Sequence, residues 1–345
     1  MFRNMALDTK DLRILELLAI NCRFSLTTLS HSVALSKASV KNRIDKLVEA
    51  GTIHTFTTLT NISKLGYGEY LLFLKLHNLT KAREDQILKF LKGHKLIFAI
   101  LKTSGVWNYL VFIASKDNEH FNDIKNDIID YCGDNAQDYD VAIWIKDYKF
   151  THSIKDMDKG TKASTIKRDP SFSRELLLKP KEYKTEKKEA IDGKDVEILK
   201  ALNKNPRADL KEIGKQVGLS IETTGYRIRN LIRKDFILGF SCVPDFFKLG
   251  YNNYFLFIQT KNVSKESEKE IIDFLQKNDF IVIAMKLMGR WNLFTSISAR
   301  NLEEYNQIVD VLQQKFAEII KSHETLNIIN WHKYELFPDG IFEQY

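Results

Sequence analysis

The stretch LSKASVKNRIDKL, residues 35–47, decides how this chain folds. Val40, Ile44 and Leu47 share one face of a helix, whereas the lysines of the stretch point elsewhere. Ser36 occupies the N-cap position, where its hydroxyl can accept a hydrogen bond from an N–H of the first turn. A basic helix that follows another short helix after a tight turn is typical of DNA recognition. The stretch therefore predicts a helix-turn-helix.

The same pattern returns 184 positions later, at residues 219–231. The offset holds without a gap over about a hundred residues and relates several spaced motifs: Asn21-x-Arg23 with Asn205-x-Arg207, Lys64-Leu65-Gly66-Tyr67 with Lys248-Leu249-Gly250-Tyr251, and Gly105-x-Trp107-Asn108 with Gly289-x-Trp291-Asn292. Self-similarity at one fixed offset indicates a tandem duplication. The last strand of the second copy is expected to be displaced by about three residues, with Trp331 in the place of Trp144.

Each copy begins with a predicted helix capped by Asp8 or Asp192. The carboxylates of Asp11 and Asp195 fall in the first turn, near the positive end of the helix dipole, and this explains them better than a catalytic role. The second helix is expected to start at Ser25 in the first copy. In the second copy it is expected to start at residue 209, where an acidic pair has the spacing of a capping box: Asp209 and Glu212.

The third helix, the recognition helix, is predicted over residues 36–50 and 220–236. Residues 51–58 follow it, are rich in threonine and β-branched side chains, and are predicted to form a β-wing. Asp235 replaces Gly51 in the second copy, so a different cap is expected at that helix end.

The rest of each copy alternates strands and helices in the order β-α-β-β-α-β. In the first copy the predicted segments are 69–76, 81–92, 96–103, 107–115, 118–131 and 139–148, and the second copy repeats them from 253 to 334. This order describes a ferredoxin-like sandwich, an antiparallel sheet covered by helices on one face. The predicted fold class is α+β, with two tandem copies of an N-terminal winged helix-turn-helix followed by a ferredoxin-like βαββαβ sandwich.

Five segments result from this reading of the chain. They are a winged helix-turn-helix at 1–60, a sandwich at 61–150, a charged linker at 151–190, a second winged helix-turn-helix at 191–244 and a second sandwich at 245–345. The linker holds 11 Lys and Arg against 7 Asp and Glu, and we expect a solvated tether. A short helix around 172–178 and a contact of the linker with the DNA backbone are alternatives.

Composition narrows the function classes. The chain has 345 residues, 44% of them hydrophobic, and a net charge of +7, which suits a polyanion partner without proving one. The cysteines, Cys22, Cys132 and Cys242, are far apart and form no CxxC pair, so neither a zinc site nor a disulfide framework is indicated. No apolar run approaches the roughly 18 residues of a membrane span. We expect a soluble, cytoplasmic protein without metal or cofactor.

These motifs resemble the leucine-responsive/asparagine regulator (Lrp/AsnC, feast/famine) family. The resemblance rests on Leu7-Asp8-x-x-Asp11-x-x-Ile14-Leu15, Asn21-x-Arg23, Leu35-Ser36, Val40-x-x-Arg43-Ile44-x-x-Leu47 and Gly51-x-Ile53, and on the junction at 64–67 and the hairpin at 104–108. Most of these marks recur in the second copy. The resemblance implies a transcription regulator rather than an enzyme, with a DNA-binding helix-turn-helix and a sandwich that dimerises and often binds an amino acid.

The implied partners are double-stranded DNA, an amino acid or other small effector, and another copy of the fold, either within the chain as a pseudo-dimer or in an oligomer. By position, the effector-binding residues would be in the hairpins: Gly105, Asn108, Gly289 and Asn292. The family hairpin usually carries Asp where Asn108 and Asn292 stand, and Asn lacks the charge that would attract an amino group. The glycines suit a tight turn, and Trp107 and Trp291 suit core or interface positions.

The predicted DNA contacts lie on the two recognition helices. In the first copy they are Lys37, Ser39, Lys41, Asn42, Arg43 and Lys46, and in the second Glu222, Thr223, Arg227, Arg229 and Arg233. Lysine and arginine suit phosphate contacts, and Asn42 and Arg43 suit base edges. The alternative is a solvated helix face on which Arg43 and Arg227 pair within the domain. Because the two helices differ, we expect an imperfect palindrome as the binding site.

Two other functions compete with transcription regulation. The same two-domain architecture resembles sirohaem decarboxylases, although neither 68–73 nor 252–255 carries the His/Arg cluster that a tetrapyrrole pocket needs. A purely architectural chromatin protein is the third alternative, and weak sequence preference would point to it.

Overall fold

The structure is a computed structural model that describes residues 7–152, 191–262 and 264–344. Nearly all of the expected linker therefore lies outside the described residues, and so does the short helix considered at 172–178. The described residues divide into two compact units that each combine both copies. The helical unit holds residues 7–60, 150–152 and 191–252, and the barrel unit holds the remainder. No helix in the described ranges is long and apolar enough to cross a membrane.

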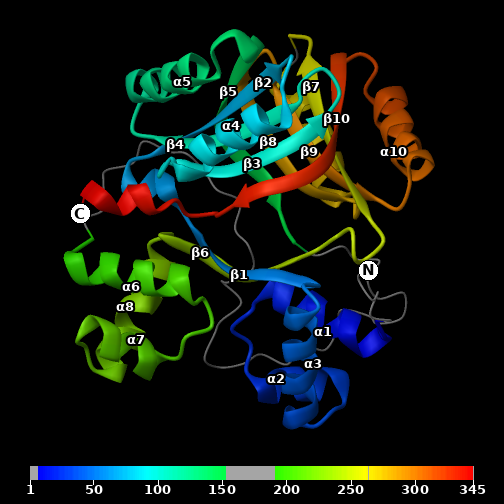
Figure 1. Cartoon of the computed structure of the whole chain (residues 1–345). Coiled ribbons are helices and arrows are strands. Elements are labelled where there is room, and N and C mark those ends of the chain that lie inside the picture. The colour runs from blue at the N-terminus through cyan, green and yellow to red at the C-terminus, as the bar shows by residue number, and fades with distance from the viewer. Residues whose placement is uncertain (1–6, 153–190, 263, 345) are drawn as a thin grey trace. The chain divides into compact units, whose positions relative to one another are not determined.

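The helical unit contains a three-helix cluster and one strand from each copy (Figure 1). These elements are α1 (Thr9–Ile20), α2 (Leu26–Val33), α3 (Lys37–Glu49) and β1 (Ile53–Thr60), and α6 (Gly193–Lys204), α7 (Leu210–Val217), α8 (Ile221–Arg233) and β6 (Ile237–Pro244). Each of the six helices has a serine or aspartate at its N-cap, as the sequence predicts. The Ser36 hydroxyl, for example, accepts a hydrogen bond from the backbone N–H of Ser39 at 3.1 Å. Full capping boxes form at Asp8 with Asp11 and at Asp192 with Asp195. At the predicted pair, Asp209 accepts from Glu212 N at 2.8 Å, which is the N-cap half of the motif.

The two predicted wings form one shared ribbon. The sequence predicts a separate wing in each copy, but β1 pairs antiparallel with β6, its counterpart in the other copy. Thr57 pairs with Ser241, the residue at the same place in the repeat, so a local two-fold axis passes between them. Helix α1 of the first copy packs on β6 of the second. An isolated two-stranded wing gains little stability, whereas pairing between copies ties the two helix clusters together.

The prediction that the second recognition helix ends in a different cap, because Asp235 replaces Gly51, is wrong. Asp235 has φ 58°, close to the 65° of Gly51. The following backbone bonds are also equivalent, because Thr52 N donates to Leu47 O and Phe236 N donates to Leu231 O, both at 2.9 Å. Aspartate is one of the few non-glycine residues that tolerate the left-handed region, so one cap serves both copies.

The barrel unit confirms the βαββαβ order in each copy. The first copy contributes β2 (Gly68–Leu76), α4 (Lys81–Gly93), β3 (Ile97–Ser104), β4 (Tyr109–Ser115), α5 (Asn118–Cys132) and β5 (Ala136–Phe150). The second contributes β7 (Asn252–Thr260), α9 (Lys265–Lys277), β8 (Ile281–Gly289), β9 (Leu293–Ala299), α10 (Leu302–Lys315) and β10 (Ile320–Tyr334). Their strands form one closed barrel in the order β10-β3-β4-β2-β5-β8-β9-β7. Strand β10 pairs with β7 of its own copy and with β3 of the other, so the two sandwiches share one sheet.

The predicted displacement of the last strand is also wrong. Leu72 pairs with Val141 on β5, and its counterpart Leu256 pairs with Thr325 on β10, which is again 184 positions later. Trp331 is therefore not the counterpart of Trp144. Cross-strand pairing keeps the register, because a shift by an odd number of residues would turn the apolar face of the strand outward.

Side chains alternate between two kinds of core along the barrel strands. Tyr70, Leu72 and Leu74 face the helices of their sandwich, as do their counterparts in the second copy. Phe73 and Phe257 face the opposite way and meet each other at 5.0 Å between ring centroids. Trp107 packs on Phe73, and Trp291 packs in the same way on Phe257. Both tryptophans are buried, at 3% and 2% exposure, as their predicted core role requires.

Candidate nucleic-acid interface

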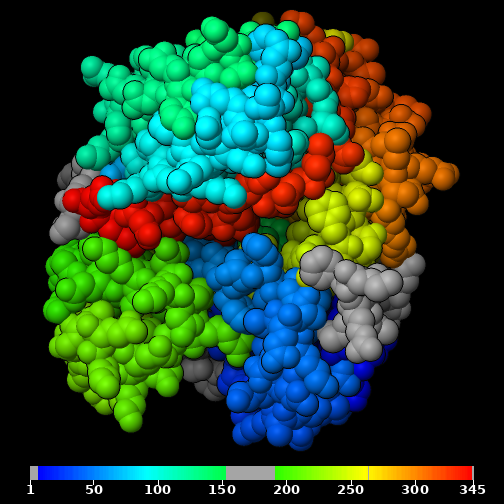
Figure 2. Space-filling view, in the orientation of Figure 1, coloured from blue at the N-terminus to red at the C-terminus, as the bar shows by residue number. Residues whose placement is uncertain are grey.

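The recognition helices α3 and α8 present a polar outer surface. Each helix buries one apolar stripe. In α3 the stripe is Val40, Ile44 and Leu47, and in α8 it includes Ile228 and Leu231, the counterparts of Ile44 and Leu47. The predicted contacts that lie exposed are Lys37, Lys41, Asn42, Lys46, Glu222, Thr223, Arg229 and Arg233, and Ser39 is half-buried. In the space-filling view the lobes of the two copies in the helical unit are separated by a recess (Figure 2). The apolar periodicity thus fixes which face of each helix is open.

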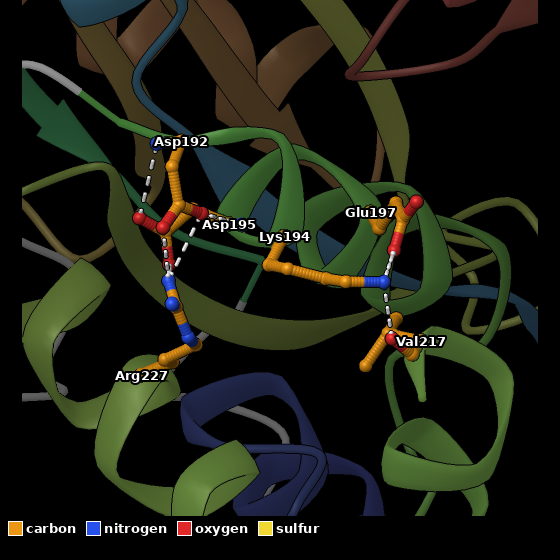
Figure 3. Close-up of polar contacts among 6 residues, drawn as sticks. All are labelled: Asp192, Lys194, Asp195, Glu197, Val217 and Arg227. Atoms are coloured by element: carbon orange, nitrogen blue, oxygen red, sulfur yellow. Dashed lines mark hydrogen bonds and ion pairs between the residues drawn. The ribbon is translucent and has the colours of Figure 1, made fainter. Parts of the chain in front are cut away.

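Arg43 and Arg227 belong to the fold of their own domains. Arg43 Nη1 lies 2.8 Å from Asp8 Oδ2 and 2.6 Å from Asp11 Oδ1. Figure 3 shows the equivalent arrangement in the second copy, where Arg227 reaches from α8 to the capping box at the start of α6. The backbone N–H of Asp195 and then the Arg227 guanidinium lower the pKa of Asp192. These contacts match the alternative of intramolecular pairing, so we leave both arginines out of the proposed DNA contacts.

Replacing Arg227 with alanine is expected to cost about 1 kcal/mol of unfolding free energy, because it removes hydrogen bonds to the exposed Asp192 carboxylate and to the largely buried Asp195 carboxylate. Chemical denaturation followed by circular dichroism measures the change. Arg229→Ala, on the exposed side of the same helix, is the matched control and should change stability by a few tenths of a kcal/mol at most. Equal losses in both variants would contradict the structural role of Arg227.

The two recognition helices carry most of their cations at positions that are not equivalent. In the first half of α3 stand Lys37 and Lys41, where α8 has Ile221 and Gly225. In the second half α8 has Arg229 and Arg233, where α3 has two acidic residues: Asp45 and Glu49. Sequence reasoning also missed Tyr226, which stands at the position of Asn42 and is 63% exposed. The sequence signal that would have indicated it is an aromatic residue on the polar face of the predicted helix.

The predicted effector residues in the hairpins have structural roles. Asn108 Nδ2 donates to Leu76 O at 2.7 Å, and its Oδ1 accepts from Leu76 N at 2.9 Å. Asn292 Oδ1 accepts in the same way from Thr260 N at 2.8 Å. Both amides thus join a hairpin to the end of β2 or β7. The paired glycines, Gly105 and Gly289, lie where each hairpin meets the closing strand of the other copy. The side chains are engaged by the backbone, so we do not propose them as effector ligands.

Each copy thus consists of a helix-turn-helix domain followed by a sandwich; the two helix-turn-helix domains share one ribbon and the two sandwiches share one barrel. The family model of the AsnC-type helix-turn-helix domain matches residues 7–48 and again 191–232. The AsnC-type helix-turn-helix domain is therefore present twice in this chain, once in each copy. The relatives identified below support the same assignment.

An uncharacterized HTH-type transcriptional regulator of Pyrococcus furiosus is 26% identical over 144 residues, which cover 41% of this chain and 94% of the relative. The regulatory protein AsnC of Haemophilus influenzae is 29% identical over 136 residues, 39% of this chain and 89% of that protein. The crystal structure of the siroheme decarboxylase NirDL superimposes over 98% of this chain and 96% of its own, with a TM-score of 0.61 and 13% identity. At that identity the likeness shows a shared tandem fold.

Proposed function

We propose that this protein is a transcription regulator that binds double-stranded DNA with sequence specificity through α3 and α8 together. The observation that carries the proposal is the pair of exposed recognition helices held about the Thr57–Ser241 dyad. A helix pair fixed by a ribbon within one chain can read two half-sites, as two subunits do in a dimeric repressor. We further propose that the protein acts in the cytoplasm and catalyses no reaction.

The proposed contacts divide by chemistry. Phosphate contacts are assigned to the exposed cations Lys37, Lys41, Lys46, Arg229 and Arg233. The hydroxyl groups of Ser39 and Thr223 are assigned further contacts with the DNA backbone. Base contacts are assigned to Asn42 and Tyr226. Glu222 repels phosphate and suits a cytosine amino group. Since Lys37 and Lys41 have no cationic counterpart in α8, and Arg229 and Arg233 have none in α3, the phosphates contacted in the two half-sites differ.

Selection of bound duplexes from random DNA tests the proposal. We expect the selected site to be an imperfect palindrome. We also expect the logarithm of the binding constant to fall with the logarithm of the salt concentration, with a slope of about 0.9 for each phosphate contacted. The Lys37→Gln/Lys41→Gln/Lys46→Gln variant should make that slope shallower by the contribution of about three phosphate contacts. The sequence that it selects should stay the same. Binding that is no tighter for selected than for scrambled duplex would overturn sequence specificity and favour an architectural role.

Replacing Tyr226 with asparagine should make the two half-sites alike at one base pair. The side chain at this position of α3 is Asn42, whose amide can bond adenine N6 and N7, whereas an aromatic ring favours the methyl group of thymine. We expect the variant to prefer adenine at the corresponding position and to bind the original site about tenfold more weakly. Repeating the selection with the variant measures this. An unchanged site would show that Tyr226 does not contact a base.

One observation favours a second candidate, an activity on tetrapyrroles. NirDL, a siroheme decarboxylase, shares the tandem fold across almost the whole of this chain. The side chains that face the inside of the barrel here include Phe73, Phe257 and Phe294, which pack on one another. Adding sirohaem to the purified protein decides between the candidates: a shifted Soret band with loss of carboxylate would favour the enzyme, and an unchanged spectrum the regulator.

A further inference from the structure

The turn that follows β6 in the second copy reaches the end of the first recognition helix. This turn, residues 245–250, is closed by its own backbone, because Leu249 N donates to Asp245 O at 3.2 Å. The Asp245 carboxylate orders its start, since Oδ1 accepts from Phe247 N at 3.1 Å. Such side-chain bonds to the following backbone are typical of well-defined turns. The turn can therefore present a side chain at a fixed place.

Two hydrogen bonds join this turn to the end of α3 in the other copy. Lys248 Nζ donates to Ala50 O at 2.6 Å, and Asp245 N donates to Thr52 O at 2.9 Å. Ala50 is the C-cap of α3, and the last carbonyls of a helix have no partner within it. An ammonium group at this negative end of the helix dipole is favourable. We call these four residues the inter-copy clamp.

The clamp encloses its lysine closely. Gly51 lies between the two clamped residues of the first copy, and a Cβ added there would lie 2.7 Å from Lys248 Nζ. The ammonium group also lies 3.8 Å from the Asp245 carboxylate, and both side chains are partly buried. A charged group that is held between a carboxylate and a helix carbonyl has fewer conformations open to it than an exposed lysine. The clamp is therefore a defined contact between the copies.

The ribbon leaves the position of α3 incompletely fixed. Helix α3 leads into β1 (Figure 1), and the pairing of β1 with β6 is irregular at this end. Ile53 pairs with Pro244 and Thr55 with Val243, so the register shifts at His54. An extra residue interrupts the ladder and bends the strand. The clamp holds residues 50–52, on the helix side of this irregularity, and thus supplies a link to the second copy where the ribbon is weakest.

We propose that the inter-copy clamp fixes α3 relative to α8 and thereby selects the spacing of the two DNA half-sites. The chain runs from α8 through β6 directly into the turn, so a bond from the turn to α3 connects the two recognition helices. Lys248 is a positioning residue here, because it acts through α3 rather than on DNA. The effect on spacing rests on the proposed function, whereas the clamp itself does not.

The expected effect on DNA follows from the geometry of the duplex. Half-sites that are read from one face lie about 10 base pairs apart, so one added base pair turns a half-site about the duplex axis by about a tenth of a turn. A fixed pair of helices cannot follow this rotation. A pair that moves independently can follow it, and it tolerates several spacings.

Binding to duplexes whose selected half-sites are separated by one base pair more or less tests the effect on spacing. We expect the full-length protein to prefer one spacing by at least about tenfold, and Lys248→Met to prefer it by less than about threefold. Lys248→Arg keeps a donor and should retain the preference. The matched control is Lys204→Met, which removes an exposed lysine at the end of α6 in the same unit and should also retain it.

A distance measurement without DNA tests the clamp itself. Spin labels at Asp45→Cys and Arg229→Cys report the separation of α3 and α8, because these positions are exposed and equivalent in the repeat. The native cysteines are buried, so the labels react with the introduced thiols. We expect one narrow distance distribution in the labelled protein, a broader one when Lys248→Met is added, and no broadening with Lys204→Met.

Each outcome decides a different part of the proposal. Equal widths with and without Lys248→Met would overturn the clamp. A broader distribution with an unchanged spacing preference would overturn its role in the choice of half-site spacing, and so would weaker binding at all spacings alike. A protein that shows the broadening but binds no duplex would contradict the proposed function and leave the clamp standing.

Discussion

Replacing Gly289 with alanine is expected to destabilise the barrel unit by about 4 kcal/mol. Gly289 has φ +146°, a conformation that residues with a Cβ rarely adopt, and a Cβ there would lie 2.8 Å from the backbone oxygen of Val141. Backbone of a paired strand cannot move aside without breaking its hydrogen bonds, so strain and overpacking add. Gly105 is the equivalent residue, at φ +138°, and a Cβ there would lie 3.1 Å from Thr325 O. Gly105→Ala should cost a similar amount.

Denaturation followed by tryptophan fluorescence measures the loss, since Trp107 and Trp291 are buried in this unit. Gly93→Ala is the control, because nothing lies within 4 Å of an added Cβ and the residue ends a helix. It should be neutral or slightly stabilising. A loss below about 1 kcal/mol in both hairpin variants would contradict the close approach of each hairpin to the other copy's closing strand.

The buried His152 is expected to make the helical unit less stable by about 3 kcal/mol as the pH falls from about 6.5 to 4. Burial lowers the pKa of His152 to about 4, and its Nδ1 lies 2.9 Å from Ser241 Oγ. Ser241 in turn donates to Ala19 O. Above the unfolded pKa the ring is neutral in both states and its contribution is complete. Between the two values the unfolded chain binds a proton and the folded chain does not, so unfolding becomes easier.

Unfolding free energy measured from pH 7.5 to 4 tests this, and His152→Gln should show a shallower decline in that window. The difference between the two curves isolates His152 from the carboxylates and from other histidines. Parallel curves would mean that His152 takes up its proton at the same pH in the folded and unfolded states.

Much of the fold follows from local sequence patterns. The apolar stripe of Val40, Ile44 and Leu47 with the N-cap Ser36 predicted α3, and the structure confirms helix, cap and buried face. The strands and helices of each sandwich also occur where their periodicity predicts them, with most bounds within one to three residues. Local patterning succeeds here because each element is selected by its own caps and by one buried face.

The candidate site was only partly predictable. The exposed lysines of α3 follow from the helical wheel, but the ion pairs of Arg43 and the exposure of Tyr226 depend on how the first and third helices of a domain pack. Phe56 of the first copy lies beneath the Arg207 guanidinium of the second copy, 5.0 Å from its ring centroid. No spacing within one copy indicates such a contact.

The sequence by itself determined that this chain is a tandem duplication with an AsnC-type helix-turn-helix in each copy, a capped recognition helix within it and a βαββαβ order after it. Only the tertiary structure decided that the two wings are one ribbon, that the sandwiches share a barrel, and that Arg43 and Arg227 pair with the capping boxes of their own domains. The physical reason is that caps and periodicity act within a few residues, whereas strand partners are chosen by which exposed edges meet in space.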